Sequence, residues 1–126
     1  MTCIPRERMP QVDFNRLPGL GEYLLVAKVP LVLRERAVVS LRTIQCLQSY
    51  NPYHSRTGEA AEKPVLVSRD GTIIDGNYRW MWHREMKHVT LPCLEVQEDL
   101  YKAMTLIRAY SGTYTYGDGK HHPFSV

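Results

Sequence analysis

The stretch Gly71-Thr-Ile-Ile-Asp-Gly-Asn-Tyr-Arg-Trp-Met-Trp-His83, GTIIDGNYRWMWH, has a short polar segment (residues 75–79) between two apolar runs. Upstream, the apolar residues 64–67 and 72–74 flank an Asp-Gly pair, the strongest short signal for a β-hairpin. Downstream, residues 77–88 contain no Pro or Gly and predict a helix. Aromatic or long apolar residues repeat down one side of it: Tyr78, Trp82 and Met86. The stretch therefore predicts a strand that passes directly into a helix.

The rest of the chain predicts shorter elements, which together give an α+β (α/β) fold, a short mixed sheet with helices packed on it. Residues 22–33 are apolar and β-branched around Pro30, and they predict a strand, a break and a short second strand at a sheet edge. An apolar stripe predicts a helix over residues 37–49. Residues 89–96 predict another strand, and residues 98–110 predict a last helix with acidic residues at its start.

The chain is expected to form one domain with an irregular segment at each end. Residues 1–20 contain three prolines and a Pro-Gly-Leu-Gly turn, which predict an irregular N-terminal arm. Residues 21–110 form the single predicted domain. Residues 111–126 predict an irregular tail rich in Tyr, Gly and His. Interleaved aromatic and basic residues are also typical of single-strand binders, and an unstructured terminus gives the same pattern.

The composition is that of an ordinary globular protein. The chain has 126 residues, of which 44% are hydrophobic and 23% charged, and its size suits one domain. No apolar run approaches the roughly 20 residues that cross a bilayer, and the charges near Met1 do not suit a signal peptide, so we expect a cytoplasmic protein. The odd number of cysteines, without a CxxC pair, predicts reduced thiols at Cys3, Cys46 and Cys93. The net charge of +3 permits contact with nucleic acid without requiring it.

The 75–79 segment, Asp75-Gly76-Asn77-Tyr78-Arg79, lies where a strand delivers a glycine to the first turn of a helix. That turn leaves several backbone N–H groups without partners inside the helix, and such groups attract anions. Gly76 would let a phosphate approach the backbone, Asn77 supplies an amide, and Arg79 adds a positive fork for phosphate oxygens. We predict a phosphate-binding loop here. The alternative is an ordinary turn in which Asp75 or Asn77 is the helix N-cap.

A longer segment resembles a known family. IIDGNYR (residues 73–79) and TLPCLEV (residues 90–96) are similar to the "I-I-D-G-x-x-R" and "T-x-P-x-x-x-V" parts of the ParB/sulfiredoxin superfamily, in the same order and spacing. VPLVLR (residues 29–34) looks like the first strand of that family, so the resemblance covers residues 28–97. It implies a small α/β fold in which the glycine loop and the following helix bind nucleotide or nucleic-acid phosphate.

The resemblance implies several activities. Members of the superfamily reduce sulfinic acids with ATP, phosphorylate serine with ADP, clamp DNA under control of CTP, or cleave DNA, as several plasmid and phage members do. The candidate enzymes are therefore a metal-assisted DNase, an NTPase and a nucleotide-dependent phosphotransferase, and the candidate cofactors are ATP, ADP or CTP with Mg²⁺. The candidate partner is nucleotide or DNA phosphate. Small members of the family suggest a phage or plasmid protein.

Two departures from the family narrow these activities. Where sulfiredoxins have Gly-Cys-His-Arg, this chain has Asn77 and Tyr78, and neither an amide nor a protonated phenol attacks a phosphoryl group at neutral pH. We therefore exclude sulfinic reductase activity. Partition proteins have Gly-Glu-Arg-Arg and further domains for which this chain has no room, so we also exclude a full partition protein. Without a nucleophile, hydrolysis would need a metal-bound water.

The candidate site residues come from the 75–79 segment and from the resemblance. Asp75 and Arg79 are the catalytic candidates, one as a carboxylate base and one as a charge clamp. The candidates for phosphate or nucleotide binding are Gly76, Asn77, Tyr78, Arg79, Arg34 and Ser40. The resemblance places one hydroxyl near the nucleotide, and Thr43 is the alternative to Ser40. We predict no metal ligands, because the histidines lack the helical spacing of a metal site.

The alternative function is that of a non-catalytic interaction protein, which binds a host protein through the same fold. Trp80 and Trp82 lie about 200 degrees apart on a helix, so one helical face cannot bury both. One of them would then meet a partner, a base or the N-terminal arm. Relatives prefer small residues where this chain has Trp82 and His83, so we expect this helix to sit farther from its sheet or to point its bulky side chains outward.

Overall fold

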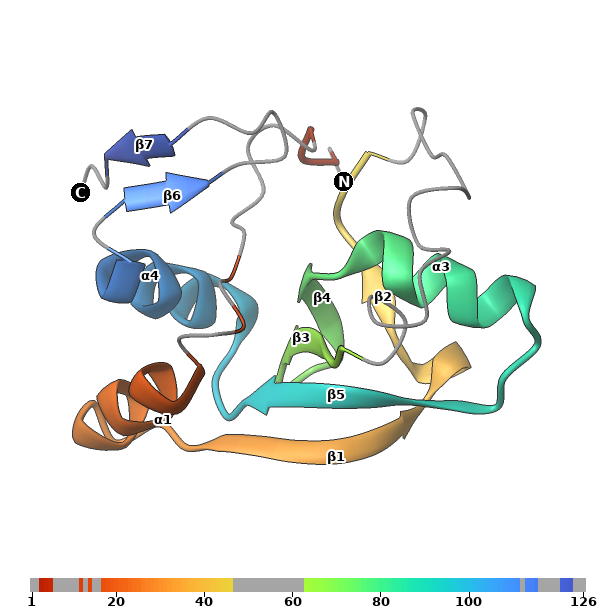
Figure 1. The fold of residues 1–126 in the computed structure, drawn as a ribbon, viewed down its shortest axis with the longest axis horizontal. Coiled ribbons are helices and arrows are strands. Elements are labelled where there is room, and N and C mark those ends of the chain that lie inside the picture. Colours follow the sequence, from red (N-terminus) through yellow and green to blue (C-terminus); the bar gives the residue numbers. More distant parts are fainter. Residues whose placement is uncertain are drawn as a thin grey trace.

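The computed structural model describes residues 3–5, 12, 14, 17–46, 63–111, 113–115 and 121–123. Over these residues the chain forms a mixed sheet of five strands in the order β1-β5-β3-β4-β2 (Figure 1). The strands are β1 (Leu31–Ala37), β2 (Arg42–Thr43), β3 (Val65–Ser68), β4 (Thr72–Asp75) and β5 (Thr90–Val96). The helices are α1 (Leu17–Val26), α3 (Asn77–Glu85) and α4 (Leu100–Ser111), and the 3₁₀ turn η3 (Val38–Ser40) lies between β1 and β2. The predicted α+β fold class is confirmed.

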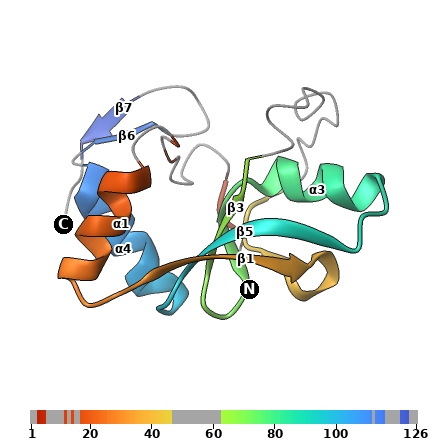
Figure 2. The same ribbon diagram turned by 60° about the horizontal axis from the view of Figure 1, so that its bottom comes forward.

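Helices cover both faces of the sheet, with α1 and α4 on one side and α3 on the other (Figure 2). The core of the first side is shared by α1, α4 and the sheet and includes Leu20, Leu24, Leu66, Ile74 and Ile107. The core of the second side is shared by α3, η3 and the sheet and includes Val38, Val67, Ile73, Trp80 and Leu91. All residues of β3 and β4 are buried, which explains why these two strands contain continuous apolar runs.

β3 and β4 form the predicted hairpin, and the predicted helix follows it directly. The two strands are antiparallel, and Gly71 takes a positive φ of 86° in the turn between them. α3 begins at Asn77 and ends at Glu85, because Lys87 adopts a left-handed conformation with a φ of 58°. The order of hairpin and helix is therefore confirmed, with a helix slightly shorter than predicted.

β5 lies between β1 and β3 although it contains Pro92, which cannot donate a backbone hydrogen bond. The register resolves this conflict. β1 pairs with β5 along its whole length, whereas the pairing with β3 begins only at Cys93. Pro92 therefore has a neighbouring strand on one side only, which is the situation of an edge strand. The predicted strand at residues 89–96 and the helix at residues 98–110 are confirmed as β5 and α4.

The N-terminal part of the domain differs from the two strands predicted over residues 22–33. Residues 17–26 form α1, which takes in the end of the predicted arm and the beginning of the predicted first strand. Leu20 and Leu24, four residues apart on one helical face, are buried in the core that α1 shares with α4. This packing outweighs the strand preference of the neighbouring residues. After Pro30 the chain forms β1 at the sheet edge, as predicted for the second strand.

The prediction of a helix over residues 37–49 is wrong for residues 37–46, the part of this segment that the structure describes. η3 and β2 occupy this segment, and β2 pairs in parallel with β4. The apolar spacing serves both cores instead, since Val38 and Leu41 are buried beside α3 and Ile44 packs against the core of α1 and α4. Pairing with β4 satisfies backbone groups that a helix would otherwise satisfy. Residues 47–62, which include the end of the predicted helix, lie outside the described part of the chain.

The tail, predicted to be irregular, contains two short strands among its described residues. β6 (Thr113–Thr115) and β7 (His121–Pro123) pair in antiparallel orientation beyond the end of α4 (Figure 1). The prediction is therefore wrong for these residues. None of the described helices has the length and the apolar character that a membrane crossing requires.

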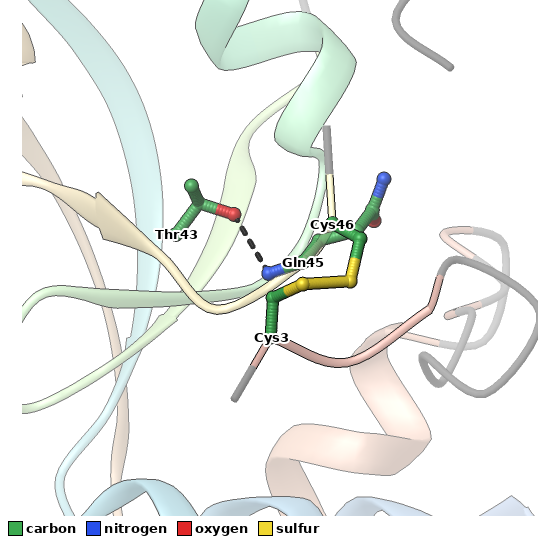
Figure 3. Close-up of a disulfide and its surroundings, with 4 residues drawn as sticks. All are labelled: Cys3, Thr43, Gln45 and Cys46. Carbon is green, nitrogen blue, oxygen red and sulfur yellow. Dashed lines mark hydrogen bonds between the residues drawn. A yellow bond between two sulfur atoms is a disulfide. The ribbon is translucent and has the colours of Figure 1, made fainter. Parts of the chain in front are cut away.

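Cys3 and Cys46 form a disulfide, which corrects the prediction of reduced thiols (Figure 3). Their Cα atoms lie 5.1 Å apart, within the range that a disulfide bridges. Ile4 forms a parallel bridge with Gln45, so residues 3–5 lie beside the chain that follows β2. Cys93 stays free and is buried in the sheet, which accounts for the odd number of cysteines.

Candidate functional site

The 75–79 loop joins β4 to α3, and Gly76 is the N-cap of that helix. Gly76 has a positive φ of 103°, a conformation that favours glycine. No side chain among the described residues caps the helix from this position, so the prediction of Asp75 or Asn77 as N-cap is wrong. The first helical bond runs from the Trp80 N–H to the Gly76 carbonyl, at 3.0 Å. The first turn of α3 therefore presents N–H groups that the helix itself cannot bond.

The Arg79 side chain folds back over Gly76. A Cβ at residue 76 would lie 2.6 Å from Nη2 of Arg79, which is too close for any side chain, so only glycine leaves room for this guanidinium. Nη2 donates to the Pro64 carbonyl at 3.3 Å and lies 3.9 Å from Oδ2 of Asp75. Burial lowers the pKa of Arg79, and the Asp75 charge opposes this shift in part. An arginine stays protonated at neutral pH, so the loop holds a buried positive charge.

Asn77, the first residue of α3, is buried and connects the helix to the chain after β2. Its Oδ1 accepts a hydrogen bond from the Thr43 hydroxyl, and its Nδ2 donates to Oε1 of Gln45 at 3.1 Å. The Thr43 hydroxyl also accepts a bond from the backbone N–H of Gln45 at 3.0 Å (Figure 3). The amide of Asn77, predicted to bind phosphate, thus fixes the start of α3 against residues 43–45. Gln45 belongs to no motif, and the sequence carried no signal for this contact.

Thr43, and not Ser40, is the hydroxyl that lies at the loop. The Ser40 hydroxyl donates to the Ala37 carbonyl at 2.6 Å, and the Ser40 carbonyl lies beside Gly71 at the other end of β4. At strand geometry this end is about 16 Å from Gly76. Because β2 runs parallel to β4, a few residues carry the chain from one end of β4 toward the other.

Arg34, the other candidate outside the loop, also lies elsewhere. It belongs to β1, which is separated from β4 by β5 and β3, a distance of about 14 Å at the usual strand spacing. Half of the Arg34 side chain is exposed, and its Nε lies 3.8 Å from the carboxylate of Glu95. The structure therefore assembles Asp75, Gly76, Asn77 and Arg79 with Thr43 and Gln45, without Arg34 or Ser40.

Two residues of the N-terminal arm lie against the loop. The backbone N–H of Val12 donates to Oδ2 of Asp75 at 3.2 Å. The ring of Phe14 lies over the guanidinium of Arg79, with 4.8 Å between the ring centroid and Cζ. Both contacts join residues more than sixty positions apart in the sequence. No local pattern pointed to them, because the arm was expected to be irregular.

The bulky residues of α3 are mostly accommodated inside the domain. Trp80 is buried, and its Nε1 donates to the Val38 carbonyl at 3.0 Å. His83 is also buried, and its Nδ1 lies 2.9 Å from Nδ1 of His88. Trp82 and Tyr78 are half-buried, whereas Met86 is exposed. The expectation that bulky side chains point outward is therefore wrong for His83, whereas the expectation that one helical face does not bury both tryptophans is confirmed, since Trp80 is buried and Trp82 is partly exposed.

Two buried donors of this site have no acceptor among the residues that the structure describes: Nε of Arg79 and Nε2 of Gln45. The side chain of Arg79 is 16% exposed, and Gln45 is 6% exposed. Both belong to the surroundings of the first turn of α3, because Arg79 lies in that turn and Gln45 bonds to Asn77. Buried polar groups are nearly always paired, so two unsatisfied donors at one helix start indicate a place for acceptor atoms.

Metal-binding chemistry has little support in the described part of the chain. Across residues 3–5, 12, 14, 17–46 and 63–111 and the short tail strands, no three His, Cys, Asp or Glu side chains gather as a metal would require. Asp75, the carboxylate that belongs to the 75–79 segment, is 7% exposed and already contacts Val12 and Arg79. Its position suits the orientation of Arg79.

No family model and no curated protein matches the chain. Two solved structures are similar to part of it. One is the C2221 form of a Pnob8-like ParB-N domain, with 15% identity and a TM-score of 0.48 over 67% of this chain and 38% of that chain. The other is a pNOB8-like ParB N-domain, with 16% identity and a TM-score of 0.45 over 67% of this chain and 35% of that chain. This chain thus matches little more than a third of each.

Proposed function

We propose that the junction of β4 and α3 binds a phosphate group of a nucleotide or nucleic acid. The observation that carries the proposal is the pair of buried donors, Arg79 Nε and Gln45 Nε2, that find no acceptor in the described part of the chain around the first turn of α3. A buried donor left unsatisfied costs about 1–3 kcal/mol. Phosphate oxygens would supply acceptors to both donors, and a bound phosphate would thereby recover this cost.

The electrostatics of the junction support an anionic ligand. The start of α3 carries the positive end of the helix dipole, and its N-cap residue Gly76 has no side chain that could cap the helix. Arg79 adds a full positive charge beside them, and its distance of 3.9 Å from Asp75 is too long for a direct hydrogen bond. Asp75 accordingly acts as a positioning residue that holds the guanidinium over Gly76, and Arg79 remains available to a phosphate.

Access to the site depends on Phe14. Its ring lies over the Arg79 guanidinium and is itself half-buried, so a ligand that approaches Arg79 from this side would displace the ring by a change of rotamer. A nucleobase offers the same kind of aromatic surface to an arginine. This supports nucleotides and single-stranded nucleic acid as ligands, in agreement with what the resemblance to the ParB/sulfiredoxin superfamily implies.

The proposal is tested by ligand-dependent stability and by calorimetry. The chain would be titrated with pyrophosphate, ATP, ADP, CTP and a short single-stranded DNA, with and without Mg²⁺. A ligand at 100 times its Kd raises the free energy of unfolding by about 2.7 kcal/mol, which is easily detected as a higher melting temperature. Release of inorganic phosphate and cleavage of the DNA, followed in the same samples, separate binding from catalysis.

The decisive variant is Arg79→Gln, with Arg69→Gln as the matched control. Both remove one positive charge, but Arg69 is exposed and lies at the opposite end of β4. We expect Arg79→Gln to weaken binding by about tenfold or more, since charge-assisted bonds to phosphate are lost. Arg69→Gln should bind as the parent does. A parent chain that binds none of these ligands, or an Arg79→Gln variant that binds them equally well, contradicts the proposal.

A further inference from the structure

We propose that the Cys3–Cys46 disulfide is a redox control on the phosphate-binding junction: it holds Gln45 and Thr43 in their binding positions, and reduction by a dithiol releases them. The inference rests on the proposed function, because its readout is phosphate binding. It adds a site of thiol–disulfide exchange to a loop whose own residues carry no redox chemistry.

The disulfide lies next in sequence to the residue that supplies one of the unsatisfied donors. Cys46 follows Gln45, and the disulfide lies close to Gln45 and Thr43 (Figure 3). Gln45 in turn bonds to Asn77 at the start of α3, at 3.1 Å. The disulfide is therefore connected to the N-terminus of α3 through Gln45 and its hydrogen bond to Asn77.

Besides the disulfide, a single parallel bridge with two backbone hydrogen bonds joins residues 3–5 to the other described residues. The Ile4 N–H donates to the Ile44 carbonyl at 2.7 Å, and the Cys46 N–H donates to the Ile4 carbonyl at 2.8 Å. This single parallel bridge is too short to be stable alone. The two cysteines are 43 positions apart, so without the covalent link the parallel bridge must close a long loop, at a considerable cost in entropy. We therefore expect reduction to detach Ile4 from Gln45.

Detachment would change the environment of Gln45. Its side chain is buried and points one amide atom at Asn77, while the backbone on either side of it bonds to Ile4. When Ile4 leaves, residues 44–46 lose their pairing partner, and the Gln45 amide gains access to water and to other rotamers. The Gln45 donor is then no longer preorganised, and phosphate binding becomes weaker because it must order this side chain again at a cost in entropy.

Reduction follows ordinary exchange chemistry. Cys3 is exposed and Cys46 is half-buried, so a thiolate of the dithiol attacks the sulfur of Cys3 and expels the Cys46 thiolate, which takes up a proton. The second thiol of the reductant then attacks the reductant sulfur that is bonded to Cys3 in the mixed disulfide, and Cys3 is released as a thiol. Two electrons and two protons pass to the protein, and the dithiol becomes a cyclic disulfide. Cys93 does not compete, because it is buried in the sheet.

The test measures the affinity of the full chain for sodium pyrophosphate by calorimetry. The oxidised chain, the chain reduced with dithiothreitol and the reduced chain after reoxidation are compared. We expect binding to weaken about tenfold on reduction and to recover on reoxidation. A Cys3→Ser/Cys46→Ser double variant should bind weakly in both conditions, and a Cys93→Ala control should respond to dithiothreitol as the parent does. Circular dichroism shows whether each species is folded. The reduction and reoxidation of the parent chain test the proposal even if the double variant does not fold.

The outcomes separate the two proposals. If the oxidised chain binds pyrophosphate and the reduced chain binds it equally well or more tightly, the redox control is overturned and the phosphate site stands. Tighter binding after reduction would mean that the disulfide holds a cover over the site. If neither form binds pyrophosphate, the phosphate site itself is wrong, and the redox control is wrong with it.

Discussion

Two buried carboxylate–arginine pairs occupy different parts of this sheet, and they differ in how completely their hydrogen bonds are satisfied. Glu95 on β5 accepts from Nη1 of Arg36 at 3.1 Å and from Nε2 of Gln97 at 2.8 Å, with Arg34 at 3.8 Å. Asp75, at the end of β4, and Arg79, in the first turn of α3, lie 3.9 Å apart, and Arg79 Nε has no acceptor among the described residues. The side chains are buried to a similar degree, with exposures of 20% and 6% in the first pair and 16% and 9% in the second.

The comparison shows that residue type and burial do not distinguish a structural pair from a candidate site. Around Glu95 the donors converge on one carboxylate, and this arrangement fits a role in stability. Beside Asp75, the buried Nε of Arg79 has no acceptor among the described residues, which fits a role in binding. Each pair also has a glycine beside its arginine, Gly71 near Arg36 and Gly76 beneath Arg79. The two regions can therefore be tested with matched substitutions.

The largest expected effect is at the satisfied pair. Glu95→Gln removes the carboxylate and leaves Arg36 without its counterion. We expect the free energy of unfolding to fall by about 3 kcal/mol, the lower end for a broken buried pair, because Arg36 is partly exposed. Urea denaturation measures this, with the exposed Glu35→Gln as the control of equal charge change. Pyrophosphate affinity should be unchanged where the variant is folded, and a loss of affinity without a loss of stability would reverse the assignment.

The two glycines sharpen the comparison with a smaller effect on stability. Gly76→Ala and Gly71→Ala each place a Cβ at a positive φ and close to an arginine, at 2.6 Å from Arg79 and 3.0 Å from Arg36. We expect each to lower the free energy of unfolding by about 2 kcal/mol. Only Gly76→Ala should also abolish pyrophosphate binding, because it displaces the Arg79 guanidinium. Calorimetry on both variants would show equal binding if Arg79 had no role.

The smallest expected effect is a pH dependence near the Glu95 region. Burial raises the pKa of the Cys93 thiol to about 11. Because the folded pKa lies above the unfolded value, the thiol contributes stability at neutral pH that is lost as the pH rises from about 9 toward 11. We expect Cys93 to account for a loss of about 1 kcal/mol by pH 10. Urea midpoints at pH 8 and pH 10 measure it, and a Cys93→Ala variant with the same slope as the parent would contradict it.

The parts of the fold that were predicted correctly are those with strong local signals. The Asp-Gly turn, the apolar runs in β3 and β4, the start of α3 and the apolar face of α4 follow from turn chemistry and periodicity. The segments that were wrong, α1 and residues 38–43, carry apolar spacings that fit more than one element. Packing of Leu20 and Leu24 beside α4 decided the first, and pairing of β2 with β4 decided the second.

The sequence by itself determined where the candidate site lies, because a strand that ends in Gly76 and a helix that starts at Asn77 are local features. Only the tertiary structure decided which residues complete it. Thr43, Gln45, Val12 and Phe14 reach the loop from distant parts of the chain, and Cys3 finds Cys46 across 43 positions. The physical reason is that backbone dihedrals and turn preferences act over a few residues, whereas burial, ion pairing and a disulfide depend on which segments the sheet brings together.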